Sequence, residues 1–117
     1  MEYLLMIYAS ERDESARDPG AQAKLMQEYQ DFTKSIVQAG QFKGGARLRP
    51  VSTASAVRVR DGKVVTTDGP FAETREQLGG YYLVEAKHLD EALAIAARIP
   101  SAKHGTIEVR PLWPASG

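Results

Sequence analysis

One carboxylate in this sequence stands at a position suited to proton transfer. Asp68 precedes Gly69 and Pro70, and this pair predicts a sharp bend, because glycine reaches positive φ and proline fixes its own φ. A carboxylate at the wall of a partly dry cleft has a raised pKa, which suits general acid or base chemistry. A structural role is the alternative, in which Asp68 accepts hydrogen bonds from amides of the turn. We predict Asp68 as the catalytic candidate.

Two segments, 56–60 and 106–110, alternate apolar and charged residues. If their apolar side chains pack on helices, Arg58, Glu108 and Arg110 lie together on the opposite face of a sheet, near the acidic candidate. Charged groups in such a cleft must be paired or stay in contact with water. The pattern therefore predicts either an ion-pair network or a site in which the arginines bind a carboxylate or enolate.

Two aromatic residues complete the predicted substrate-binding set. Tyr29 lies on the apolar stripe of a helix expected over 18–39, and Phe71 follows the bend, as a loop anchor or a ligand contact. Arg47 and Arg49 follow a pair of glycines, where arginines hold an anionic ligand or simply lie on the surface. We carry Tyr29 and Phe71 forward as site residues.

Composition excludes several classes of function. The 117 residues contain no cysteine, and 15 basic residues balance 15 acidic ones, so nothing indicates a thiolate metal site or a surface for nucleic acid or anionic membrane. His88 and His104 share no local motif with other ligands, and no phosphate-binding glycine loop is present. We therefore predict no metal and no cofactor. The apolar run near the N-terminus is too short for a membrane span, and we expect a cytoplasmic protein.

The elements that position these residues follow from periodicity and turn signals. Residues 3–9 are apolar at every position, which is typical of a strand buried on both faces and indicates that a partner covers one of them. A charged loop over 10–18 precedes the first helix. The remaining predictions are an irregular strand within 41–55, a hairpin turning at Asp61-Gly62, a polar stretch over 72–78 with a short helical turn, a strand over 81–86, a helix from about 88 to 99 and a strand over 106–110. The length of 117 residues predicts a single domain over 1–117, in which Gly79-Gly80 lets the backbone pass close to another segment.

Residues 68–76, DGPFAETRE, resemble the DGPF signature of the YCII-related family, with Arg75 where lysine is usual. The flanks 57–62, 77–82 and 108–111 are also similar to that family. The resemblance implies a ferredoxin-like βαββαβ two-layer sandwich that forms a homodimer as a dimeric α+β barrel. Other YCII-related proteins carry a helical histidine near the position of Tyr29, which this chain lacks.

Two classes of function remain open from the sequence. One is cofactor-independent acid–base chemistry, or binding of a small anionic or phenolic ligand, in a cleft at the dimer interface. The other is a non-catalytic regulatory module, because DGPF-type domains resemble segments associated with sigma factors and would act on transcription through protein contacts. A polar pocket that holds Asp68 and an arginine favours the first, and an exposed apolar patch favours the second.

Overall fold

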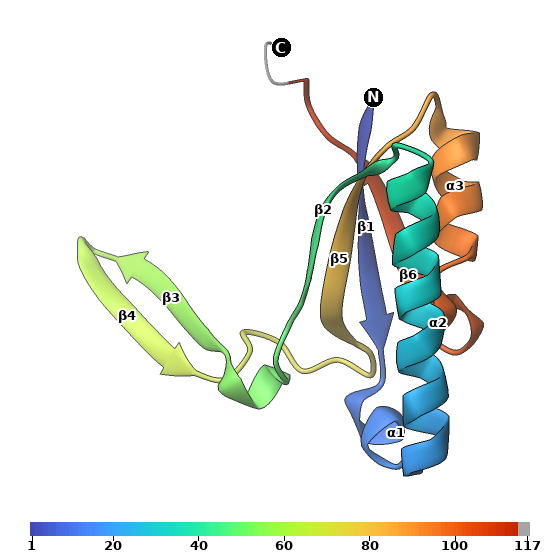
Figure 1. Cartoon of the computed structure of the whole chain (residues 1–117). Coiled ribbons are helices and arrows are strands. Elements are labelled where there is room, and N and C mark those ends of the chain that lie inside the picture. The colour runs from blue at the N-terminus through green and yellow to red at the C-terminus, as the bar shows by residue number, and fades with distance from the viewer. Residues whose placement is uncertain (115–117) are drawn as a thin grey trace.

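The chain alternates strands and helices, with one β-hairpin inserted between the second and third strands of the main sheet (Figure 1). The computed structural model describes residues 1–114. Its elements are β1 (Glu2–Ala9), α1 (Glu11–Ser15), α2 (Pro19–Gln38), β2 (Phe42–Arg47), β3 (Ser55–Arg60), β4 (Lys63–Asp68), β5 (Gln77–Glu85), α3 (Leu89–Ala97) and β6 (Thr106–Pro111). Short 3-10 turns cover Val51–Thr53 and Pro100–Lys103.

The main sheet has four antiparallel strands in the order β2-β5-β1-β6. If the hairpin is set aside, this is the strand order of a ferredoxin-like fold, so the α+β class predicted from the sequence is confirmed. Strands β3 and β4 form a separate two-stranded sheet. One chain therefore consists of a two-layer body and a projecting hairpin.

The core lies between the sheet and helices α2 and α3, which cover the same face (Figure 1). Alternate residues of β1 point into it, and Leu5 is fully buried, as are Val84 on β5 and Ile36 on α2. Ile95 and Ile99 are buried at α3 and just beyond it. Burying one such side chain contributes roughly 1.5–3 kcal/mol, so this layer supplies most of the stability of the body.

The opposite face of the sheet has no covering layer among residues 1–114. Leu4, Met6 and Tyr8 of β1 and Tyr81 and Leu83 of β5 are apolar but remain partly exposed. The sequence predicted burial of β1 on both faces, and a single chain buries only one, because both helices lie on the same side. We refer to these five residues as the open sheet face.

Local sequence signals gave the first long helix and the hairpin turn correctly. The Asp18 carboxylate accepts a hydrogen bond from the Ala21 amide at 2.8 Å, and Pro19 is the first residue of α2. The helix ends before Gly40, whose φ is 72°. Asp61 and Gly62 have φ of 52° and 74°, the two positive values of a type I′ turn.

Three local predictions were wrong. Residues 11–15 form α1 rather than a loop, because Ser10 caps the helix and acidic residues occupy its first turn. Residues 72–76 form bends and irregular backbone, residues 77 and 78 already belong to β5, and the stretch contains no helical turn. Val57 and Val59 do not pack on helices; they lie on the projecting hairpin and are 63% and 59% exposed.

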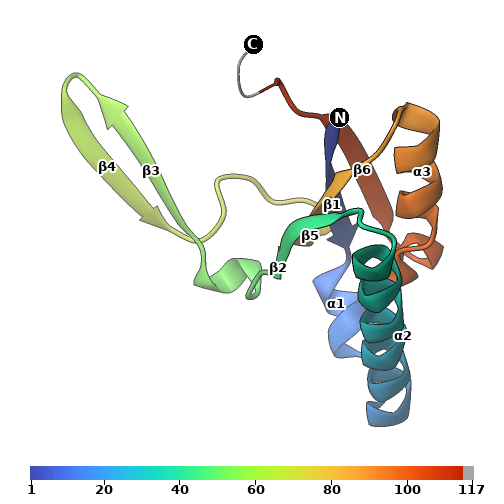
Figure 2. The same cartoon turned by 45° about the horizontal axis from the view of Figure 1, so that its top comes forward.

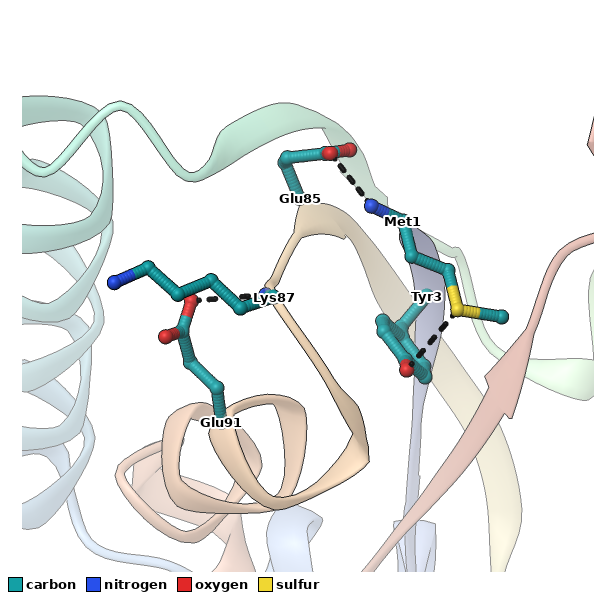
Figure 3. Close-up of polar contacts among 5 residues, drawn as sticks. All are labelled: Met1, Tyr3, Glu85, Lys87 and Glu91. Atoms are coloured by element: carbon teal, nitrogen blue, oxygen red, sulfur yellow. Dashed lines mark hydrogen bonds and ion pairs between the residues drawn. The ribbon is translucent and has the colours of Figure 1, made fainter.

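Polar contacts secure the ends of β1 and β5 (Figure 3). The Met1 ammonium lies 2.6 Å from the Glu85 carboxylate, and this hydrogen bond holds the pKa of Glu85 below its usual value. At the start of α3, the His88 ring accepts from the Glu91 amide, and the Glu91 carboxylate accepts from the Lys87 amide (Figure 3 draws the second contact). These reciprocal bonds resemble a capping box. No helix within residues 1–114 is long and apolar enough to span a membrane.

Candidate functional site

A cavity of about 350 Å³ lies between α2 and the sheet, on the helix side. Strands β1, β2 and β5 form its floor, α2 forms its roof, and Glu14 of α1 and Ser101 also line it. Its lining is mainly apolar, and the residues that the following argument uses are Leu25, Met26, Tyr29, Thr33, Phe42, Arg47, Gly80 and Tyr82. We refer to it as the α2 pocket.

Two glycines lie in the α2 pocket where the backbones of β2 and β5 approach each other closely. Gly45 of β2 and Gly80 of β5 line it. A Cβ on Gly80 would lie 2.8 Å from the Ala46 carbonyl oxygen, and one on Gly45 would lie 2.8 Å from the Tyr81 carbonyl oxygen. Neither position therefore accepts a side chain without a shift of backbone. The close approach predicted at Gly79-Gly80 is confirmed for Gly80, whereas a Cβ on Gly79 would meet its nearest atom only at 4.0 Å.

Two pairs of hydroxyl groups line the α2 pocket. The Tyr29 hydroxyl lies 2.6 Å from Ser101 Oγ, and the Thr33 hydroxyl lies 2.6 Å from the Tyr82 hydroxyl. Burial raises the pKa of both tyrosines above the ordinary value of 10.0. Both phenols are therefore protonated at neutral pH. They offer a ligand neutral hydrogen-bonding groups rather than a phenolate base.

Charged and amide groups stand at the same pocket. Arg47 from β2, Glu14 from α1 and Gln22 from α2 line it. Within residues 1–114, Arg47 forms no ion pair. A guanidinium beside an apolar cavity can bind a carboxylate through two parallel hydrogen bonds, and it can bind a phenolate oxygen through a charge-assisted hydrogen bond. Arg47 therefore stays a candidate for binding an anionic ligand, whereas Arg49 does not line the pocket.

Of the residues predicted as a site, Tyr29 lines the α2 pocket and the others do not. Asp68 ends β4, and Phe71, 82% exposed, follows it outside the body. In the hairpin register Asp68 pairs with Ser55, which places it on the face opposite Arg58. One chain therefore separates the acidic candidate from its predicted arginine partner.

Glu108 and Arg110 lie on β6, at the edge of the sheet farthest from β2. They point away from the helices, as predicted, because Ile107 and Val109 pack against the core. No ion pair within residues 1–114 joins either of them to the hairpin. The charged cluster does not form within one chain and stays a prediction for an assembly. Within the described part of the chain, the Asp68 carboxylate also accepts no hydrogen bond from the amides of the turn.

The sequence interpretation missed Thr33, Tyr82 and Ser101 as site residues. Thr33 follows Tyr29 by four positions, so helical spacing alone placed both on one side of α2. No sequence signal brings Ser101 to that helix, because the two residues are 72 positions apart. No group of three or more His, Asp or Glu in residues 1–114 is arranged to hold a metal ion.

The fold and pocket define a small α+β domain with a ligand-sized cavity under one helix. The YCII-related domain family matches residues 1–116, and the chain belongs to that family. The chain is 38% identical over 114 residues to Uncharacterized protein R00369 of Rhizobium meliloti (strain 1021), a match that covers 96% of this chain and 92% of that protein. The family predicted from the DGPF-like segment is thereby confirmed, and assignment to the DGPF branch stays a prediction.

Proposed function

We propose that this YCII-related protein binds a small phenol or carboxylic acid in the α2 pocket. The observation that carries the proposal is the cavity of about 350 Å³ that combines apolar walls, two hydroxyl pairs and Arg47. Ligand sites commonly enclose about 300–1,000 Å³ and join an apolar lining to a few polar groups. The volume suits a compact ligand at the lower end of that range.

The lining supports a ligand with an apolar body and one polar end. Leu25, Met26 and Phe42 offer apolar contact. Arg47 offers charge-assisted hydrogen bonds to an anionic oxygen. The protonated Tyr29 phenol supplies or accepts a neutral hydrogen bond. This division favours an aromatic or short aliphatic acid over a sugar or a nucleotide.

Acid–base chemistry on such a ligand requires a carboxylate within reach. Within one chain, Glu14 lines the α2 pocket and Asp68 does not. Asp68 acts on the ligand only if an assembly of two chains brings it there. Cofactor-independent proton transfer is therefore the reaction class that we propose, with Glu14 as the nearer candidate base and Asp68 as one that depends on the dimer.

The dimer belongs to this proposal. The open sheet face, represented by Leu4, Met6 and Leu83, is apolar and lacks a covering layer within residues 1–114. Two such faces stacked about 10 Å apart would form the interior of a dimeric α+β barrel. Pairing of two identical faces is also the arrangement that two-fold symmetry favours.

A regulatory module that works through protein contacts is the second candidate. Exposed apolar side chains outside the body favour it, since Phe71 is 82% and Trp113 is 93% exposed. The α2 pocket favours ligand binding, and a regulatory protein that senses the same small molecule would satisfy both observations.

A thermal-shift screen of small carboxylic acids and phenols tests the binding proposal. A ligand at 100 times its dissociation constant stabilises the folded state by about 2.7 kcal/mol. We expect a hit to raise the melting temperature of the wild type and of Arg49→Met, and to have little effect on Arg47→Met. Arg49 is the matched control because it lies two residues further along and outside the α2 pocket. Equal shifts in all three proteins, or no hit, would overturn the assignment.

A further inference from the structure

The β3–β4 hairpin presents one apolar and one basic face. Cross-strand pairing of Val59 with Val64 and of Val57 with Thr66 places the three valines on the same side. Arg58, Arg60 and Lys63 occupy the other side, together with Val65. Val57, Val59 and Val64 are 63%, 59% and 69% exposed. We refer to these three residues as the valine face.

The hairpin projects from a fixed base. The Gly69 amide donates to the Ala54 carbonyl at 2.7 Å, and the Val51 amide donates to the Glu11 carboxylate at 3.0 Å. Beyond this base β3 and β4 pack mainly against each other. Figures 1 and 2 both show the hairpin leaving the body on the side away from α2 and α3. A two-stranded hairpin alone is marginally stable in water, so this arrangement calls for a covering surface.

The surface area of the chain is too large for a compact monomer. The accessible area is 8449 Å², whereas a monomer of 12.8 kDa is expected to expose about 6,300 Å². The radius of gyration is 16.3 Å, compared with about 13 Å expected for a domain of this length. The excess area exceeds the roughly 800 Å² that each partner buries in a standard interface.

We infer that the β3–β4 hairpin is an intersubunit arm whose valine face packs against a second copy of this chain. The inference rests on the dimer proposed above and adds a second contact region to it. The arm and the open sheet face lie on the same side of the chain, so two copies related by a two-fold axis bring each arm to the other body. Six-residue strands extend about 20 Å, and packed sheets lie about 10 Å apart, so the arm reaches past the sheet of the second copy.

The basic face of the arm remains in water in this arrangement, because burial of three cations that form no ion pair within residues 1–114 is unfavourable. The valines lose their contact with water, which supplies the driving force. The base of the arm carries Asp68 and Phe71, and docking moves both from bulk solvent to the subunit interface. The DGPF-like bend is then part of the assembly rather than a free loop.

Neighbouring residues on opposite faces of the arm provide a matched test. Val64→Asp places a charge on the valine face, and Val65→Asp places the same charge beside the arginines. Both substitutions disfavour the strand equally, and neither touches the core of the body. We expect sedimentation equilibrium to show a rise of at least 100-fold in the dimer dissociation constant for Val64→Asp and of less than 10-fold for Val65→Asp, with unchanged far-UV circular dichroism.

Hydrogen exchange supplies the second readout. Amides of β3 and β4 should exchange slowly in wild-type dimer, and faster on dilution or in Val64→Asp. A wild-type dimer with equal dissociation constants in the two variants and unprotected arm amides would overturn the arm while leaving the sheet dimer in place. A wild type that is monomeric at tens of micromolar, with its arm free for another protein, would overturn both the arm contact and the sheet dimer. Ligand binding in the α2 pocket is measured separately through Arg47→Met.

Discussion

Adding one methyl group at Gly80 should destabilise the protein, whereas the same change at Gly79 should not. A Cβ on Gly80 would lie 2.8 Å from the Ala46 oxygen and 3.5 Å from the Arg47 Cα, so β2 must move to accept it. Overpacking of this kind costs about 1–3 kcal/mol. Loss of glycine freedom in the unfolded chain offsets about 0.4–1 kcal/mol of that cost. We expect Gly80→Ala to lose about 1–2 kcal/mol.

Gly79→Ala is the control, because its nearest neighbour, the Ile7 oxygen, is 4.0 Å from the added Cβ. Its stability should equal that of the wild type or exceed it by about 0.5 kcal/mol. Urea unfolding followed by far-UV circular dichroism measures both, and the melting temperature of Gly80→Ala should fall by roughly 4–8 °C. Ligand affinity should fall as well, since Arg47 moves with β2. If Gly80→Ala matches the wild type, or if both variants lose the same stability, the close approach does not exist as described.

Three further outcomes are expected. Asp18→Ala should lose about 1 kcal/mol in urea unfolding, because it removes the cap on α2, and an unchanged midpoint would contradict the role of the 2.8 Å bond. The pKa values of Tyr29 and Tyr82 are raised in the folded state, so these tyrosines ionise first in the unfolded state. Their contribution to the free energy of unfolding is therefore fully present below pH 10.0 and declines as the pH rises above that value. Unfolding curves between pH 9 and 11 measure this decline, and Tyr29→Phe should make it less steep. Asp68→Asn should leave folding intact and abolish ligand binding if the dimer brings that carboxylate to the pocket, and a variant that unfolds or binds normally refutes its assignment.

Predictions that rest on a few neighbouring residues were correct for the ends of α2 and for the hairpin turn. Asp18 followed by proline began a helix, and Gly40 ended it. Asp61-Gly62 turned a hairpin because both residues tolerate positive φ. Each of these features is decided by the conformational preferences of two or three residues, so no distant part of the chain can easily change it.

The same kind of reasoning failed where the partner of a strand had to be known. Val57 and Val59 alternate with arginines in the way that any half-buried strand does, and the pattern does not say whether helices or another chain cover the valines. The structure detaches that strand from the helices altogether. The predicted charged cluster around Asp68 required the valines to pack on the helices. Because they do not, one chain does not bring the cluster together.

By itself, the amino-acid sequence determined the family, the α+β class, the ends of the long helix and the turn of the hairpin, because short-range preferences and a nine-residue segment carry that information. Only the tertiary structure decided where the cavity lies. It joins Tyr29 to Ser101 across 72 positions and Thr33 to Tyr82 across 49, and such contacts arise from the packing of α2 on the sheet rather than from any local pattern.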